Sequence, residues 1–140
     1  MQIMNLEETL LEIMKFVDIV ECRVLGIRKN QPIDVAFVEG LVGSKEEEKK
    51  LVEIRKKARV LVVMGDCACS GGKFLMKDFN NIEIRLDPLD KIVNVDYYLW
   101  GCPIDRKEFL QLVRDILHDR KPRKTSLSYS SAKFMLSQAK

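Results

Sequence analysis

Long hydrophobic runs are absent from this sequence. No apolar stretch approaches the roughly 18–20 residues that a helix needs to cross a bilayer, and no secretory signal is visible at the start of the 140 residues. We therefore expect a cytoplasmic protein without a membrane span. Four cysteines in such a chain favour reduced thiols or metal ligands over a disulfide framework.

A strong charge of one sign is also missing. The 24 basic and 21 acidic residues are interspersed and leave a net charge of +3, so we expect no nucleic-acid partner. The single histidine, His118, ends an expected helix, where it suits the helix dipole better than a metal. No Ser–His–Asp or Cys–His arrangement supports nucleophilic catalysis, and Gly71-Gly72 lacks the spacing of a dinucleotide fingerprint. We expect no catalytic residue in this chain.

Helical and strand patterns alternate through residues 1–121. Capping residues and apolar spacing predict helices over residues 5–17, 44–57 and 105–118. Apolar or alternating runs predict strands over residues 18–25, 34–38, 60–64 and 95–100, and an edge strand over residues 82–86 is one assignment of the stretch between them. This alternation predicts an α/β domain with parallel strands. Residues 122–140 read as a tail rich in Ser and Lys.

Two cysteines directly follow predicted strands. Cys67 lies in the stretch Gly-Asp-Cys-Ala-Cys-Ser-Gly-Gly at residues 65–72, and Cys102 lies in a Gly-Cys-Pro stretch after the strand over residues 95–100. Glycines allow the backbone to turn sharply and to approach a ligand closely, and open α/β sheets place ligands at the carboxyl ends of their strands. The pattern predicts a shared metal or redox site.

These segments, together with Asp-Val-Ala-Phe-Val-Glu-Gly at residues 34–40, resemble the small subunit of [NiFe]-hydrogenases and the related cluster-bearing subunit of complex I. The resemblance covers roughly residues 3–124 and is strongest to cytoplasmic, cofactor-reducing hydrogenases. It implies a flavodoxin-like three-layer sandwich with a mostly parallel sheet and a proximal [4Fe-4S] cluster. It also implies an oxidoreductase subunit that transfers electrons between a large catalytic subunit and a cofactor-reducing subunit.

The resemblance also implies roles for individual residues. Family members hold the cluster on four thiolates, of which Cys67 and Cys102 match two, and Glu39 matches an acidic residue near the cluster. Cys69 is a third thiol in the same stretch, at a position where the family is not restricted to cysteine. The alternative for these cysteines is simple packing, and for Glu39 an ordinary strand-end carboxylate. Cys22 lies within a predicted strand, and we expect no chemistry there.

The sequence departs from the family where the first strand and its Cys-x-x-Cys are expected, because Met1 aligns at or just after the second of those cysteines. Three explanations stay open: a start at an internal Met, a cluster-less relative kept for its protein contacts, or a cluster completed by Cys69 and another chain. The leading hypothesis is an electron-transfer subunit. The alternatives are a cluster-less structural or assembly module and a small thiol-redox protein using Cys67 and Cys69. A sheet edge left uncovered by an absent first strand predicts self-association.

Overall fold

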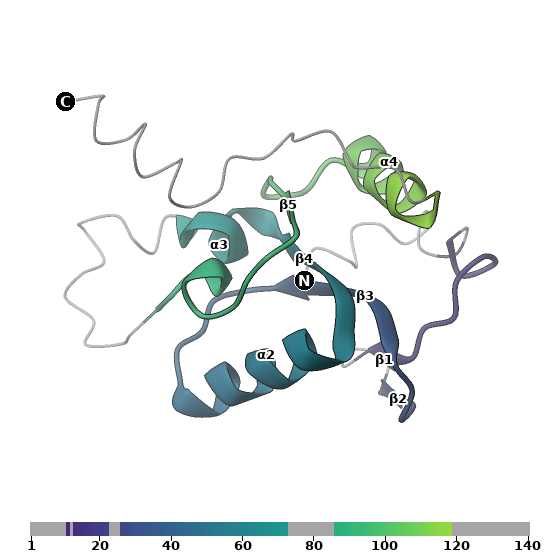
Figure 1. Ribbon diagram of the computed structural model, residues 1–140. Helices are drawn as coiled ribbons and strands as arrows, with labels where there is room; N and C mark the ends of the chain where they lie inside the picture. The colour runs from purple at the N-terminus through teal and green to yellow at the C-terminus, as the bar shows by residue number, and fades with distance from the viewer. Residues whose placement is uncertain (1–10, 12, 23–25, 73–85, 119–140) are drawn as a thin grey trace.

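Three parallel strands form the sheet at the centre of the protein (Figure 1). The computed structural model describes residues 11, 13–22, 26–72 and 86–118. The strands are β3 (Ile33–Glu39), β4 (Ala58–Met64) and β5 (Tyr97–Leu99), and they lie in the order β3-β4-β5. Both pairings are parallel. The predicted α/β class and parallel sheet are confirmed.

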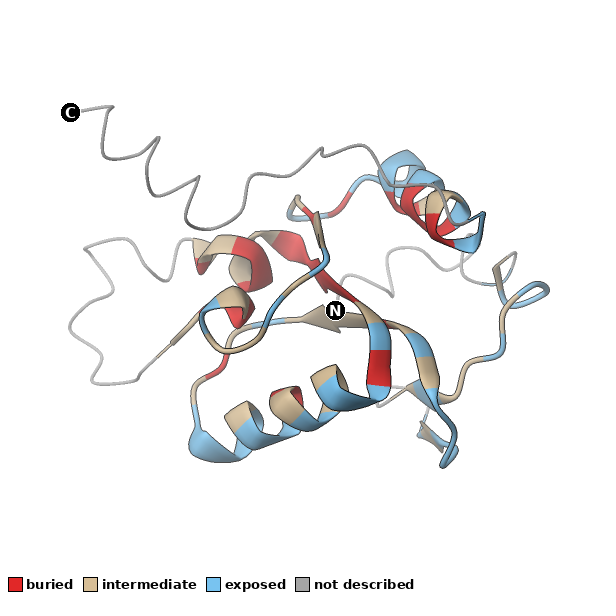
Figure 2. Cartoon of the chain, viewed as in Figure 1, coloured by how far each residue is buried: buried red, intermediate tan, exposed pale blue. Residues whose placement is uncertain are grey.

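The central strand β4 is buried on both faces, as its apolar sequence predicts. Leu61, Val62 and Val63 are fully buried and Met64 is 1% exposed. Figure 2 shows the end of this strand in the colour of buried residues. Because side chains alternate across a strand, Val62 and Met64 pack on one face of the sheet, while Leu61 and Val63 pack on the other. The core is therefore continuous through the middle of the sheet.

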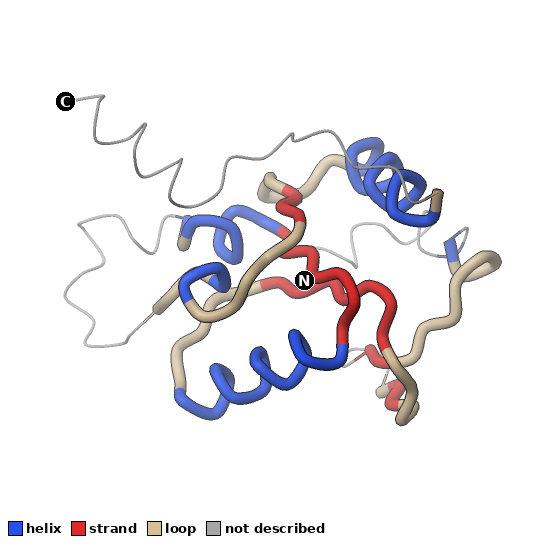
Figure 3. The backbone as a smooth tube through the Cα atoms, viewed as in Figure 1, coloured by secondary structure: helices blue, strands red, loops and turns tan. Residues whose placement is uncertain are grey.

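Helices cover both faces of the sheet and make it a three-layer sandwich (Figure 3). On one face lie α2 (Lys45–Lys57), the short α3 (Gly65–Ser70) and the 3-10 helix η4 (Leu89–Lys91), which contribute buried residues to one cluster with Val63. On the other face α4 (Arg106–Leu117) packs against Val62, Met64 and Leu99. This arrangement is the one that the flavodoxin-like prediction requires.

The two long helices begin at the predicted capping residues. The Ser44 side chain accepts a hydrogen bond from the backbone N–H of Glu47 at 3.2 Å, and Asp105 Oδ1 accepts from the N–H groups of Lys107 and Glu108. Such caps satisfy backbone donors that the helix itself leaves without partners. No helix within the described ranges is long and apolar enough to cross a membrane.

Of the strand predicted over residues 18–25, the structure confirms only Glu21–Cys22: residues 18–20 are not in a strand, and residues 23–25 lie outside the described residues. The structure has a separate two-stranded antiparallel sheet of β1 (Glu21–Cys22) and β2 (Ile27–Arg28). Gly26 immediately before β2 has a φ of 65°, a left-handed conformation suited to reversing the chain. The alternating pattern of residues 18–25 does not mark the residue at which a short strand begins.

Other helices and strands also differ from their predicted boundaries. Residues 65–70, where no helix was predicted, form α3, and the strand predicted over residues 95–100 is limited to Tyr97–Leu99. Of the helix predicted over residues 5–17, Leu11 and Ile13 are helical and residues 14–16 form a turn. Val17 is in a bend, whereas residues 5–10 and 12 of that helix, residues 82–85 of the proposed edge strand, and the tail over residues 122–140 lie outside the described residues.

Candidate functional site at the carboxyl end of the sheet

The three predicted site segments begin at the same edge of the sheet. Glu39 ends β3 and is in register with Met64, which ends β4; Met64 is in turn in register with Leu99, which ends β5. The strands are parallel, so their carboxyl ends lie together. The chain segments that carry Glu39, Cys67 and Cys102 therefore start side by side, at the edge where open α/β sheets bind ligands.

Cys67 lies in α3, which begins directly after β4. The helix ends at Gly71, whose left-handed backbone (φ 86°) lets its N–H donate to the carbonyl of Cys67 at 2.8 Å. Gly72 lies against the thiol: a Cβ added there would be 3.3 Å from Cys67 Sγ. Glycine at position 72 thus leaves space beside the half-buried Cys67 side chain.

Cys102 lies at the tip of a tight turn after β5. Gly101 has a φ of 123°, and a Cβ at this position would be 2.6 Å from the carbonyl oxygen of Pro103. Gly101 and Ile104 form an antiparallel bridge around the turn, and Ile104 is buried in the core. Because the turn is anchored at Ile104, the exposed Cys102 is held at its outer end.

A hydrogen bond joins the two cysteine segments. Oδ1 of Asp66 accepts the backbone N–H of Gly101 at 2.8 Å. Each bonded residue directly precedes a cysteine, Asp66 before Cys67 and Gly101 before Cys102. This bond links residues 35 positions apart in the chain. Sequence reasoning assigned Asp66 no role; its position between a buried strand and a candidate ligand was the available signal.

Cys69 occupies a different environment from Cys67. Its side chain is fully buried, and its Sγ is 3.8 Å from the Val63 carbonyl oxygen and 3.7 Å from that of Leu99. Burial, assisted by the negative charge of Asp66, raises the pKa of this thiol from 9.0 to about 12. A protonated, buried thiol is a poor ligand and a poor nucleophile. Cys69 is therefore a core residue, and the geometry argues against a Cys67–Cys69 redox pair.

The remaining predicted residues lie elsewhere or at the rim. Glu39 is half-buried at the end of β3. Cys22 is half-buried in the separate β1–β2 sheet, away from the strands that carry the site. His118 is the exposed C-cap residue of α4, where a cation would suit the helix dipole.

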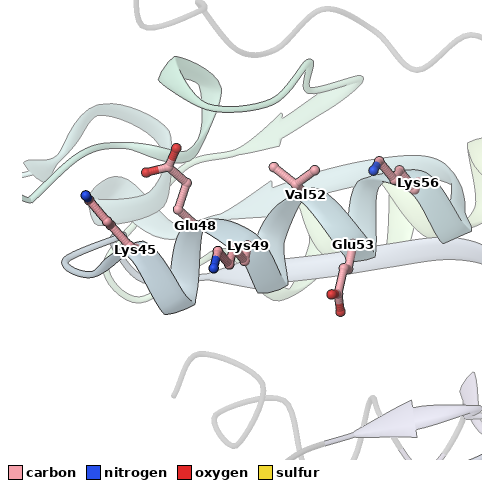
Figure 4. A pocket seen from close by; sticks show the side chains of 6 residues that line it. All are labelled: Lys45, Glu48, Lys49, Val52, Glu53 and Lys56. Carbon is pink, nitrogen blue, oxygen red and sulfur yellow. The ribbon is translucent and has the colours of Figure 1, made fainter.

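A surface hollow lies along α2 and not at the cysteine edge (Figure 4). Its described lining comes from α2 alone and consists of Lys45, Glu48, Lys49, Val52, Glu53 and Lys56. Both charge signs alternate along this helix face, and Lys50 and Glu46 form an i,i+4 ion pair on the same helix. These features describe a solvated helix face.

Residues 1–116 match the model of the family described as NADH ubiquinone oxidoreductase, 20 kDa subunit. The chain belongs to this family. The match extends over more than three quarters of the chain and includes both cysteine segments. The resemblance seen in the motifs is therefore confirmed.

Several curated relatives are hydrogenase subunits. The chain is 34% identical over 95 residues to the gamma subunit of a coenzyme F420 hydrogenase from Methanosarcina barkeri, covering 63% of this chain and 37% of the relative. It is 26% identical over 137 residues to the delta subunit of sulfhydrogenase 2 from Pyrococcus furiosus, covering 87% and 58%. An uncharacterized protein of Methanocaldococcus jannaschii is 37% identical over 92 residues, covering 63% and 43%. The chain thus spans about half the length of these relatives.

A solved structure supports the fold. A chain of the NAD+-reducing [NiFe]-hydrogenase in the H2-reduced state superposes with a TM-score of 0.66 and 24% identity, covering 87% of this chain and 83% of that one. At this identity the likeness concerns the fold alone. The three-layer architecture of this family member is therefore the one seen in a hydrogenase subunit.

The described residues fit the ligand set of an iron–sulfur cluster only in part. A [4Fe-4S] cluster takes four thiolates, and Cys67 and Cys102 fit two of these positions by their chemistry and by their placement on linked segments. The buried Cys69 does not fit a third. Among the described residues no three His, Cys, Asp or Glu side chains come together to bind a metal ion.

Proposed function

We propose that this chain is an electron-transfer subunit of a [NiFe]-hydrogenase-like oxidoreductase complex, in which Cys67 and Cys102 supply thiolates to a proximal [4Fe-4S] cluster. The observation that carries this proposal is the junction of the two cysteine segments at one edge of the sheet, linked by the Asp66–Gly101 hydrogen bond. Thiols on two linked segments at strand ends suit a shared thiophilic group. Membership of the family supports the same reading.

The remaining ligands come from outside these 140 residues in this proposal. The sequence has four cysteines, of which Cys22 lies in the separate β1–β2 sheet and Cys69 in the core. Two further thiolates must then come from additional residues of the same polypeptide or from a second subunit. The short span of the chain relative to its curated relatives is consistent with this requirement.

Each residue has a definite task. The cluster, when bound, supplies one-electron transfer. Cys67 and Cys102 bind it, and the half-buried Glu39 at the same sheet edge adds negative charge, which lowers a cluster's reduction potential. A large subunit carries out the hydrogen chemistry and a cofactor-reducing subunit accepts the electrons, both in the cytoplasm. This chain alone therefore has no turnover.

The test is iron and acid-labile sulfide analysis of the complete protein, purified without oxygen together with its co-purifying subunits. We expect iron and sulfide in equal amounts and an electron paramagnetic resonance signal after reduction. Cys67→Ser and Cys102→Ser should each reduce the iron content, while the matched control Cys22→Ser should keep it. Iron-free wild-type protein, or iron retained in both site variants, would contradict the proposal.

A second candidate function is a cluster-less structural or assembly module of the same complex. It is favoured by one observation: the described residues bring no third metal-binding side chain to Cys67 and Cys102. In this case the same preparation contains the partner subunits but no iron, and the two serine variants co-purify with those subunits as well as the wild type does.

A further inference from the structure

We propose that Asp66 is a positioning residue that holds the Cys102 turn beside Cys67, so that the two thiols act as one pair. The inference rests on the proposed pairing of these cysteines. Its basis is the 2.8 Å hydrogen bond from the Gly101 N–H to Asp66 Oδ1. A bond between a carboxylate and a backbone N–H is charge-assisted, and is stronger than one between neutral groups.

The regular backbone does not hold the two segments together at this point. The registered pairing of β4 with β5 ends at Met64 and Leu99. Beyond it, one chain turns into α3 and the other into the turn at residues 101–104. Asp66 therefore provides, with a side chain, the link that the strand ladder no longer makes.

The Cys102 turn is shaped to present this donor. Gly101 adopts a φ that side chains rarely tolerate, and its Cα lies so close to Pro103 that a Cβ would clash. Ile104, on the far side of the turn, is 5% exposed. With Ile104 anchored in the core and the Gly101 N–H on Asp66, both ends of the turn are fixed and Cys102 is presented between them.

Asp96 offers a matched control, because it makes the same kind of bond at the other end of β5. Its Oδ2 accepts the backbone N–H of Leu61, also at 2.8 Å and also across 35 positions. No cysteine segment lies next to this bond: its neighbours are Arg55, at 2.7 Å from the same oxygen, and the regular pairing of β4 with β5. Loss of this carboxylate should weaken the fold without separating the two thiols.

The probe is phenylarsine oxide, a trivalent arsenical that bridges two neighbouring thiols, with its affinity measured on the reduced 140-residue chain. The parent protein is Cys22→Ser, which leaves Cys67 and Cys102 as the thiols outside the core. We expect binding to require both cysteines. Asp66→Ala should weaken it by about tenfold or more, the loss expected for one charge-assisted hydrogen bond. Asp66→Asn, which keeps an acceptor oxygen, should remain within about threefold of the parent, and Asp96→Ala should bind as the parent does.

Several outcomes would overturn the inference. The first is a parent protein that does not bind the arsenical, and the second is an unchanged affinity in Asp66→Ala. The third is a loss of affinity in Asp66→Asn as large as that in Asp66→Ala, because it would assign the effect to the charge of the carboxylate and not to the position of the acceptor. If Asp66→Ala does not fold, Asp66→Glu takes its place: it keeps the charge but displaces the acceptor by one methylene, and should also lose affinity. Iron analysis is independent of this assay. A protein without iron in which arsenical binding still depends on Asp66 would contradict the proposed function and leave this inference standing.

Discussion

Two aspartates each accept a backbone N–H close to β5, Asp96 at the start of the strand and Asp66 of α3 beyond its end. The two bonds have different roles. Asp96 accepts the Leu61 N–H and pairs with Arg55, so it joins α2, β4 and β5 where the sheet is regular. Asp66 accepts the Gly101 N–H where the ladder has ended and the glycine-rich cysteine segments begin. The difference teaches that the amino end of this sheet is built for stability, whereas the carboxyl end is built to place side chains.

Replacing Gly101 by Ala should cause the largest loss of stability, because it distorts the Cys102 turn at the carboxyl end of the sheet. The new Cβ would lie 2.6 Å from the Pro103 carbonyl oxygen at a φ of 123°. We expect the free energy of unfolding in urea to fall by roughly 3 kcal/mol. Gly26→Ala is the control, since its φ of 65° is also positive but, its chain neighbours aside, no atom of the described residues lies within 4 Å of the added Cβ. That variant should lose only about 1 kcal/mol, and equal losses would show that crowding at Gly101 is unimportant.

The aspartate variants compare the two ends directly. Asp96→Ala leaves the N–H of the fully buried Leu61 without its carboxylate acceptor and removes the Arg55 ion pair, so the free energy of unfolding should fall by about 2 kcal/mol. Asp66→Ala leaves the half-buried Gly101 N–H without its acceptor and should cost about 1.5 kcal/mol. Urea titrations of both variants show which of the two loses more free energy of unfolding. A larger loss in Asp66→Ala would reverse the proposed division between stability and placement.

The two cysteines of α3 should differ on a smaller scale. Cys69→Ala removes a fully buried sulfur from the core and should lower the free energy of unfolding by about 1 kcal/mol. Cys67→Ala changes a half-buried side chain and should cost less than about 0.5 kcal/mol. In native protein, a thiol-specific reagent should modify the exposed Cys102 before Cys69, whose modification should wait for unfolding. Rapid native labelling of Cys69 would contradict its assignment to the core.

The smallest effect should come from Tyr98, which lies in β5 between the two aspartates. Its hydroxyl donates to Asp90 Oδ2 at 3.1 Å, and burial together with the Asp90 charge raises the pKa of the phenol. The folded state therefore holds this proton more tightly than the unfolded state does. The resulting stabilisation is complete below the ordinary pKa of tyrosine, about 10, and is lost as the pH rises above it.

Urea titrations of wild type and Tyr98→Phe between neutral and strongly alkaline pH measure this contribution. We expect the difference in free energy of unfolding to be constant near neutral pH and to shrink above pH about 10. Phenylalanine at this position has no proton to lose, which makes it the control for other alkaline effects. A difference that stays constant through that range would show that the phenol pKa is not raised.

Much of the fold could be predicted from local sequence patterns. Buried apolar runs marked β3 and β4, and the capping residues Ser44 and Asp105 marked the starts of α2 and α4, because these signals depend on residues close together in the chain. The strand predicted over residues 18–25 began too early, and β2 was not predicted, since alternation alone does not mark where a short strand begins. The pattern likewise did not distinguish a loop from a short helix after β4.

The sequence by itself determined that two cysteines follow two buried strands, and so that they lie at one edge of a parallel sheet. Only the tertiary structure decided which thiols stay outside the core at that edge. Two positions apart on a helix differ by roughly 200° in direction, so the fold of residues 65–70 as α3 sends Cys69 into the core while Cys67 stays at the edge. The bond between Asp66 and Gly101 is likewise a product of the assembled sheet, because no local rule relates residues 35 positions apart.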